Sequence, residues 1–208
     1  ITNMGAELGA TTSIFPYDHR SETYLNATKR KEIAVLARHY KETLLRPDPD
    51  VGKNPEKYFS KVIEIDLSRL EPHVVGPHSP DVARPISKLA QDVKKNNYPD
   101  KLKACLIGSC TNSSYEDIAR VADIAKQAKK MGLKAKTMLL ITPGSEMIFE
   151  TIKRDGFVKA MEDVGAVVMA NACGPCIGQW KRTDVKKGES NSILTSYNRN
   201  FPRRNDGN

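Results

Sequence analysis

Three of the four cysteines lie in short, glycine-containing segments of the kind that form ligand-binding loops. Cys110 belongs to Gly108-Ser109-Cys110-Thr111-Asn112, and the other two form Cys173-Gly174-Pro175-Cys176. Cysteine thiolates ligate soft metals, and iron–sulfur clusters are usually held by four of them. If only three converge, one iron of a [4Fe–4S] cluster lacks a protein ligand and can act as a Lewis acid on a substrate oxygen. The three cysteines therefore predict a metal centre with an open position.

Two other kinds of chemistry stand beside the cluster hypothesis. Cys173-Gly174-Pro175-Cys176 has the letters of a thioredoxin-type redox dithiol, which should open a long amphipathic helix after a tryptophan. Here Asn171-Ala172 precedes the pair and Gly178 follows it, and Cys110 would have no role. Structural zinc is the second alternative, but zinc needs a fourth ligand. The nearest candidate, His78, precedes Cys110 by 32 residues.

The second half of the chain alternates between strand and helix patterns. A helix with an apolar face follows Ser113 or Ser114, either of which can cap it, and Gly132 ends it. A further helical stretch is interrupted at Gly156. Alternation of this kind is typical of a mostly parallel sheet between helices, a three-layer α/β/α domain. The predicted strands are residues 102–107, 136–141, 166–170 and 193–196.

This arrangement predicts that the three cysteines meet. Cys110 follows one predicted strand and precedes a helix N-terminus, which favours its thiolate. Cys173 and Cys176 follow another strand. Ligand sites in open α/β sheets form beyond the carboxyl ends of the strands, so we expect the three at one edge. Cys105 lies inside a predicted strand, and we interpret it as a small buried hydrophobic residue.

The first hundred residues are less regular. Residues 1–20 form a Gly- and Thr-rich turn region, and a helix with one apolar stripe is predicted from Ile33 to Leu44. Residues 62–67 have the composition of a short strand. Pro and Gly are dense between Glu71 and Pro85, which indicates a linker or an extended boundary segment.

Composition bounds the function. The chain has 208 residues, of which 39% are hydrophobic and 28% charged, as in ordinary globular proteins. No apolar run approaches the roughly 20 residues of a membrane span. The net charge of +8 favours an anionic partner, nucleic acid or a small carboxylate, although most basic residues have acidic neighbours, as on solvated faces. Only Arg199, Arg203 and Arg204 are concentrated enough for a site. Because Ile1 opens the chain without a leader, we expect a piece of a longer polypeptide.

Two segments resemble the cluster signatures of the aconitase family. They are Gly108-Ser109-Cys110-Thr111-Asn112-Ser113-Ser114-Tyr115-Glu116-Asp117 and Asn171-Ala172-Cys173-Gly174-Pro175-Cys176-Ile177-Gly178-Gln179-Trp180. The 63-residue spacing between Cys110 and Cys173 fits the mitochondrial type of the family. The resemblance covers essentially the whole chain and is weakest between about residues 20 and 100. Further matching segments are residues 3–12, 142–145 and 195–201.

The resemblance implies a hydro-lyase of the tricarboxylic acid cycle in the mitochondrial matrix. Such an enzyme converts citrate to isocitrate through cis-aconitate. The resemblance implies that Cys110, Cys173 and Cys176 ligate three irons of a [4Fe–4S] cluster, whose fourth iron binds the substrate hydroxyl and a carboxylate. It also implies that Arg199 and Arg204 bind substrate carboxylates, a task suited to the planar guanidinium group.

Three further residues receive roles from the resemblance. Asn198 and Asn3 would hydrogen-bond around the cluster and its bound oxygen, and Glu7 would act near the substrate hydroxyl. The family's catalytic serine and its Asp and His residues belong to segments outside this sequence, so the fragment alone is expected to be inactive.

One position departs from the family pattern. After Asn198-Arg199-Asn200-Phe201 that pattern has any residue, then glycine, then arginine, whereas this chain has Pro202-Arg203-Arg204. If the backbone there needs a positive φ, Arg203 is costly and the placement of Arg204 is in question.

The sequence thus predicts the end of a preceding α/β domain in residues 1–72 and a cluster-bearing α/β domain in residues 73–208. The expected partners are a small tricarboxylate and the remaining domains of a parent chain, with no membrane and with nucleic acid not favoured. A non-catalytic aconitase-like module, structural or RNA-binding, is the alternative from another class. A homocitrate hydratase is the narrower alternative, because one methylene gives only about 1–3 kcal/mol of discrimination.

Overall fold

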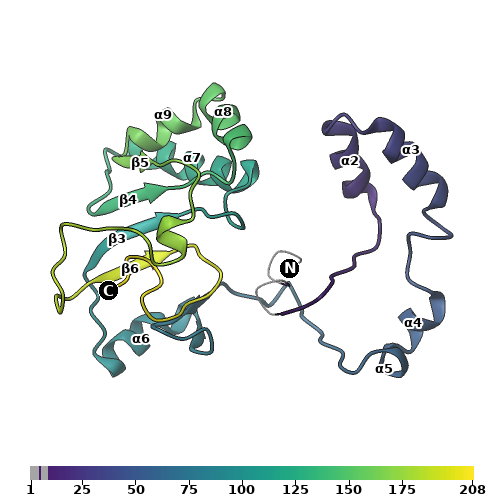
Figure 1. The fold of residues 1–208 in the computed structure, drawn as a ribbon, viewed down its shortest axis with the longest axis horizontal. Helices are drawn as coiled ribbons and strands as arrows, with labels where there is room; N and C mark the ends of the chain where they lie inside the picture. The colour runs from purple at the N-terminus through teal and green to yellow at the C-terminus, as the bar shows by residue number, and fades with distance from the viewer. Residues whose placement is uncertain (1–4, 6–8) are drawn as a thin grey trace. The chain divides into compact units, whose positions relative to one another are not determined.

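A computed structural model describes residue 5 and residues 9–208 (Figure 1). Contacts between Cα atoms divide the chain into two compact units, residues 1–70 and residues 71–208. Two residues of the predicted site, Asn3 and Glu7, lie outside the described residues.

The regular elements in the described part of the first unit are helices, and irregular segments connect them. Asp18 caps α2 by accepting a hydrogen bond from the backbone N–H of Ser21 at 2.8 Å. Helix α3 packs against α2, and an ion pair between Arg38 and Glu22 joins the two helices. The helices are α2 (His19–Ala27), α3 (Lys31–Tyr40), α4 (Pro49–Lys53) and α5 (Pro55–Tyr58).

Two predictions for the first unit need correction. The helix predicted from Ile33 to Leu44 is confirmed up to Tyr40, but Leu44 lies beyond its end and its apolar stripe is exposed, since Leu36 is 54% accessible. The predicted strand at residues 62–67 is wrong, because that segment has no regular structure and Ile63 is 71% accessible. A strand forms only when its backbone N–H and C=O groups find a partner strand, and a β-rich composition does not provide one.

The second unit holds two sheets and most of the long helices. A small sheet pairs β1 with β2 in antiparallel register, and a larger one contains four strands. The elements are β1 (His73–Val75), β2 (Ala83–Pro85), α6 (Ile86–Asn96), β3 (Leu102–Ile107), α7 (Tyr115–Lys130), β4 (Met138–Ile141), α8 (Glu146–Arg154), α9 (Phe157–Glu162), β5 (Ala166–Val168), a 3-10 turn (Gly174–Cys176) and β6 (Ser192–Thr195).

The four-stranded sheet is parallel and has the order β5-β4-β3-β6. Strand β3 is central and pairs on one side with β4 (Leu106 opposite Leu140) and on the other with β6 (Leu106 opposite Thr195). The predicted α/β class and the four predicted strands of this sheet are therefore confirmed. Because all four strands run the same way, their carboxyl ends lie at one edge.

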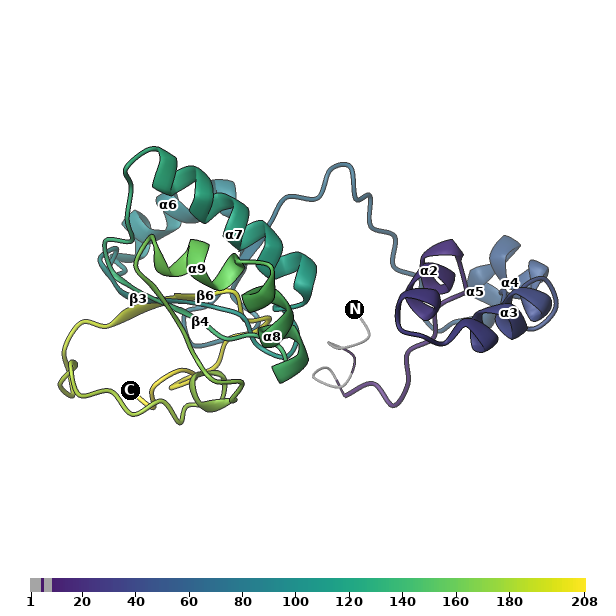
Figure 2. The ribbon, with the colours of Figure 1, turned by 90° about the horizontal axis from the view of Figure 1, so that it is seen from above.

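The main core lies between the sheet and helices α7, α8 and α9, which cover one face (Figure 2). Helix α7 contributes Ile118, Ala122 and Ala125, spaced four and three residues apart as a helical face requires. A capping box between Ser114 and Asp117 starts this helix, as the sequence predicts. A second, smaller core is formed by three buried side chains of the sheet, Ala104, Leu106 and Leu140. Trp180, Met169 and Tyr197 pack against them.

The predicted linker between Glu71 and Pro85 is partly wrong, since it contains the β1–β2 hairpin. The prolines are compatible with this hairpin because its two strands are three residues long and form a sheet of only two strands. Helix α6 is not among the elements predicted from the sequence, although Ile86, Leu89 and Val93 follow the helical period. The ion pair between Arg84 and Asp92 at 2.7 Å fastens α6 to the hairpin.

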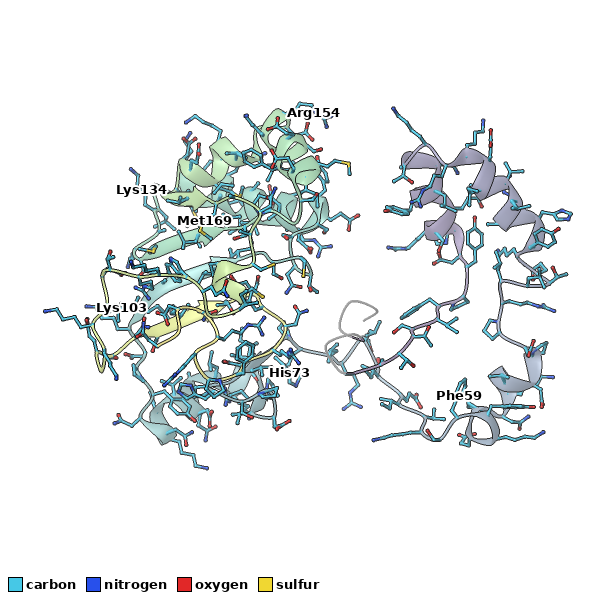
Figure 3. The ribbon with its side chains drawn as sticks, in the orientation of Figure 1. Phe59, His73, Lys103, Lys134, Arg154 and Met169 are labelled. Carbon is cyan, nitrogen blue, oxygen red and sulfur yellow. The ribbon has the colours of Figure 1, made fainter. Side chains whose placement is uncertain are left out.

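Part of the positive charge is paired at the surface. Figure 3 shows Lys103 and Arg154 at the periphery of the second unit, where Lys103 pairs with Glu189 at 2.7 Å and Arg154 with Asp155 at 2.8 Å. Such pairs are typical of solvated faces. None of the helices in the described part of the chain has the length and apolar character that crossing a membrane requires.

The buried face of α7 makes a direct stability prediction. Replacing Ile118, which is fully buried, by alanine is expected to lower the free energy of unfolding by about 2–5 kcal/mol, because it opens a cavity in the core. Ile124→Ala removes the same atoms from a side chain that is 66% accessible and should change it by less than about 0.5 kcal/mol. Urea denaturation of the 208-residue chain measures both, and equal effects would contradict this core.

Candidate functional site

The carboxyl edge of the sheet carries most of the predicted site residues. Cys110 follows β3, Cys173 and Cys176 follow β5, and Arg199 follows β6. Backbone hydrogen bonds continue beyond the strand ends, from Thr142 N to the Ile107 carbonyl at 2.8 Å and from Ser196 N to the Leu106 carbonyl at 3.0 Å. The loops therefore start in a fixed register from adjacent strands.

Gly108 allows these loops to pack together. It has a φ of +98°, and a Cβ at this position would lie 2.0 Å from the carbonyl oxygen of Thr142. Its backbone N–H donates to Ser196 Oγ at 3.0 Å. Any side chain here would force apart the loops that follow β3 and β4, which is why glycine precedes the Cys110 segment.

The three predicted cysteine ligands line one small pocket of about 80 Å³. All three are free thiols; Cys110 and Cys173 are exposed and Cys176 is partly buried. Cys105 lies within β3, is only partly buried and does not line this pocket. The structure therefore separates the three cysteines from the fourth, as the sequence predicts.

The geometry can be compared with the two alternatives to an iron–sulfur cluster, a redox dithiol and structural zinc. After Cys173 the chain makes only the three-residue 3-10 turn Gly174–Cys176, whereas a redox dithiol of the thioredoxin type opens a long helix. Among the described residues, no three Cys, His, Asp or Glu side chains are close enough together to hold a single metal ion. A zinc ion draws its ligands to about 2.0–2.3 Å, so this arrangement does not match a closed zinc site.

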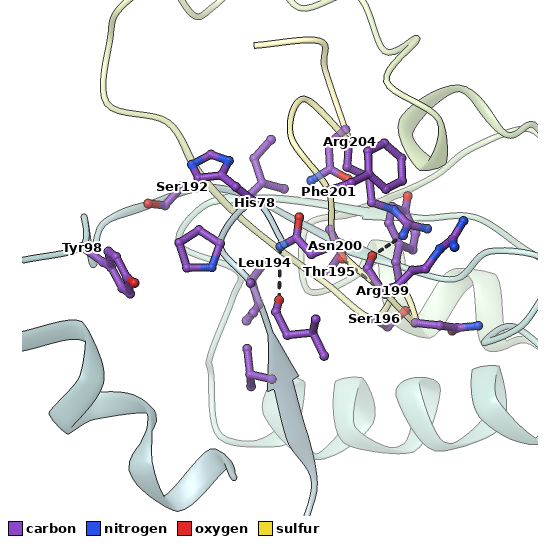
Figure 4. A pocket seen from close by; sticks show the side chains of 18 of the residues that line it. His78, Tyr98, Ser192, Leu194, Thr195, Ser196, Arg199, Asn200, Phe201 and Arg204 are labelled. Carbon is purple, nitrogen blue, oxygen red and sulfur yellow. Dashed lines mark hydrogen bonds between the residues drawn. The ribbon is translucent and has the colours of Figure 1, made fainter. Parts of the chain in front are cut away.

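A larger pocket of about 710 Å³ adjoins the cysteine pocket, with Tyr197 lining both. Its walls come from the β1–β2 hairpin, from β6 and from the loop after β6, which brings Asn198, Arg199 and Arg204 (Figure 4). The structure thus collects all the predicted substrate-binding residues around one cavity beside the predicted metal ligands.

Arg204 connects the two pockets. One terminal nitrogen, Nη2, donates to the sulfur of Cys176 at 3.0 Å, and the other, Nη1, donates to the carbonyl oxygen of Arg199. The guanidinium lies 5.1 Å from the ring centroids of both Tyr197 and Phe201. Its Nε is buried and has no hydrogen-bond partner among the described residues. A buried donor of this kind needs an acceptor, and a carboxylate oxygen is a suitable one.

Tyr197 separates the cysteine sulfurs from the larger cavity. Burial raises the pKa of Tyr197 to about 12, and negative charge on Cys176 adds to this effect while Arg204 opposes it. The phenol therefore stays protonated at neutral pH and can donate a hydrogen bond. Tyr197 is not among the site residues predicted from the sequence, where its only signal is its position between β6 and Arg199.

Asn198 is oriented by Asn112, which follows Cys110 by two residues. Asn112 Nδ2 donates to Asn198 Oδ1 at 2.5 Å and also to the carbonyl of Ser196. This contact joins the loop of the first cysteine to the loop of the arginines. The amide NH₂ of Asn198 consequently points away from Asn112.

A buried ion pair fixes the chain on the far side of the arginines. The side chain of Arg182 is fully buried and lies 3.5 Å from a carboxylate oxygen of Asp206, which is 3% accessible. Asn191 links both, since it accepts from Arg182 at 2.8 Å and donates to Asp206 at 2.8 Å. Arg182 also pairs with the partly exposed Asp184 at 2.5 Å. Because a buried charge is costly without its partners, the network restrains the segment that carries Arg204.

Arg203, which stands where the family pattern has glycine, has a left-handed backbone conformation. Its φ is +63°, in the region that glycine adopts readily. The carbonyl oxygen of Arg203 would lie 2.7 Å from a Cβ on Gly178, which itself has a φ of +79°. The loop that carries Arg203 and Arg204 therefore approaches the segment after Cys176 so closely that only a glycine fits at position 178.

Comparison with known proteins shows the family of the chain. The sequence profile of the aconitase family (aconitate hydratase) matches residues 1–208, so the chain belongs to the aconitase family. The chain is similar to proteins named mitochondrial aconitate hydratase, with 57% identity in Arthroderma benhamiae, 56% in Schizosaccharomyces pombe and 56% in Aspergillus fumigatus. Each alignment covers the whole chain and 26% of the relative, so the chain spans about a quarter of the length of these curated relatives.

The backbone of Arg203 predicts a stabilising substitution. Arg203→Gly is expected to raise the free energy of unfolding by about 0.5–1 kcal/mol: it relieves a left-handed penalty of about 1–2 kcal/mol and costs about 0.4–1 kcal/mol in unfolded-chain entropy. Arg120→Gly, at an exposed position within α7, should lower it by about 1 kcal/mol. Urea denaturation of the two variants distinguishes them, and the same sign for both would refute the strain at Arg203.

Proposed function

We propose that this chain carries the iron–sulfur centre and part of the substrate site of an aconitate hydratase, a hydro-lyase that isomerises citrate to isocitrate through cis-aconitate. The observation that carries the proposal is the contact at 3.0 Å between Arg204 and Cys176. It joins a pocket lined by three free cysteines to a cavity lined by Arg199 and Arg204. A metal-ligating thiol beside a carboxylate-binding cation is what this reaction requires.

The donor set fits a cluster held through three cysteines. Cys110, Cys173 and Cys176 line one pocket, and no fourth cysteine lines it. In a cluster each cysteine ligates a different iron, so the three sulfurs need not crowd around a single ion. When bound, a [4Fe–4S] cluster supplies an iron without a cysteine ligand, a Lewis acid for the hydroxyl and a carboxylate of the substrate.

The remaining chemistry of this chain is binding and orientation. Arg199 and Arg204 hold substrate carboxylates through paired N–H donors, which fixes the direction from which the substrate meets the metal pocket. Asn198, oriented by Asn112, donates a hydrogen bond near the cluster. Asn3 and Glu7 are assigned to the cluster environment and to the substrate hydroxyl by family resemblance alone. Proton transfer is supplied by the parent protein outside this sequence.

The setting of the protein follows from its relatives. Those named above are mitochondrial aconitate hydratases, so we place this protein in the mitochondrial matrix and its reaction in the tricarboxylic acid cycle. We further propose that residues 1–72 are the end of a preceding domain and that residues 73–208 are the cluster-bearing domain of the parent protein.

The cluster assignment predicts a metal content. The intact protein, reconstituted without oxygen, is expected to contain about four irons and four sulfides and to lose them in Cys173→Ser. Cys105→Ser replaces a cysteine that lies in β3 outside the pocket and should retain the metal. Iron and sulfide analysis with an absorbance spectrum measures both variants. A reconstituted protein without iron would rule out the cluster.

The carboxylate assignment predicts a separate effect on substrate. Arg199→Lys keeps the charge but loses the paired donors, so kcat/KM for citrate should fall about ten- to a hundredfold, or about 1.4–2.7 kcal/mol. Iron content should stay unchanged. Arg120→Lys, on the exposed face of α7, is the matched control and should have the wild-type kcat/KM. An unchanged kcat/KM in Arg199→Lys would contradict the role of this residue in substrate binding.

A further inference from the structure

The two arginines lie on a loop that has no regular secondary structure. Residues 196–200 contain no helix or strand, and residues 202–206 form turns. A loop that presents binding groups must be held by side-chain contacts with a rigid scaffold, because its own backbone lacks a repeating hydrogen-bond pattern. Asn200, directly after Arg199, makes such a contact.

Asn200 reaches a distant part of the chain. Its Nδ2 donates to the carbonyl oxygen of Val75 at 3.1 Å, across a separation of 125 residues (Figure 4). Val75 is the last residue of β1, and the next residue, Gly76, donates to the carbonyl of Val82 at 2.8 Å. The acceptor of Asn200 is therefore part of a hydrogen-bonded hairpin.

Gly76 leaves the space that the Asn200 side chain occupies. A Cβ on residue 76 would lie 1.9 Å from Asn200 Nδ2 and 2.9 Å from its Cγ. Gly76 also has a φ of +111°, which only glycine adopts at low cost. The side-chain amide of Asn200 thus occupies the space that a side chain on residue 76 would fill.

The hairpin is a firm support. Besides the ion pair between Arg84 and Asp92, Glu71 accepts hydrogen bonds from the backbone N–H and the hydroxyl of Ser87 at 3.1 and 2.6 Å. Ile86 N donates to the carbonyl of Pro72 at 2.8 Å. These contacts join β2 and the two residues before β1 to α6, so the Val75 carbonyl belongs to a well-supported hairpin.

One peptide group links the hydrogen bond between Asn200 and Val75 to both Arg199 and Arg204. Arg204 donates to the carbonyl of Arg199, and that carbonyl belongs to the peptide bond between Arg199 and Asn200. We propose that Asn200 is a positioning residue whose hydrogen bond to Val75, made in the gap left by Gly76, fixes this peptide and so sets both guanidinium groups. This role rests on the proposed binding of carboxylates by Arg199 and Arg204.

The direct test measures ligand binding in the intact protein. Asn200→Asp has the same shape but replaces the donor by an acceptor that faces the Val75 carbonyl. It should weaken calorimetrically measured binding of propane-1,2,3-tricarboxylate roughly tenfold and raise KM for citrate more than it lowers kcat, because misplaced binding groups lose affinity. Iron and sulfide content should not change, since the cysteine loops are not altered. Asn97→Asp, the same change at an exposed position after α6, is the matched control and should bind as the wild type does.

The complementary test changes Gly76 in the hairpin. Gly76→Ala should weaken binding as Asn200→Ala does, and the double variant should lose little more than Gly76→Ala alone, because the methyl group enters space that the amide has left. Thermal unfolding identifies any variant that fails to fold, and the isosteric Asn200→Asp then decides. Binding by Asn200→Asp within twofold of wild type, or independent losses in the double variant, would overturn the positioning role. If the wild type itself does not bind the tricarboxylate, the proposed carboxylate site fails as well.

Discussion

The close approach of three neighbouring parallel strand ends, those of β3, β4 and β6, is the constraint on which the rest of the site depends. Gly108 leaves no room for a side chain beside the carbonyl of Thr142, and its N–H binds Ser196. The loops after β3, β4 and β6 are therefore in contact where they leave the sheet. A cysteine from one loop and polar side chains from another can meet only because this packing brings the strand ends within the reach of single side chains.

Polar side chains then hold together loops that have no regular structure of their own. Asn112 binds Asn198, Arg204 binds Cys176, and the buried Arg182 network restrains the last residues. Each contact spans segments far apart in the sequence, and each satisfies a donor or a charge that would be costly to bury alone. The same contacts that stabilise the loops therefore orient the groups proposed to bind metal and substrate.

One of the four described non-glycine residues with a positive φ, Arg203, lies at this edge. Arg203 and Gly178 both have positive φ angles and approach each other where the arginine and cysteine loops meet. Backbone strain of this kind persists where the surrounding contacts over-determine the conformation, as the neighbouring Arg204 and Arg182 contacts do here. In this chain a glycine, which adopts a positive φ readily, is present at position 178 and absent at position 203.

Local features of the sequence determined the strands of the main sheet and the capped helix α7, and they singled out three cysteines as candidate ligands. Periodicity, capping residues and short spacings can be recognised in a few neighbouring residues. They did not determine the fate of residues 62–67, the β1–β2 hairpin or the exposed stripe of α3, which depend on partners elsewhere in the fold. Only the tertiary structure placed Tyr197 between the pockets and Asn200 against Val75. The physical reason is range: a hydrogen bond across 125 residues leaves no periodic signal in the chain, whereas an amphipathic helix does.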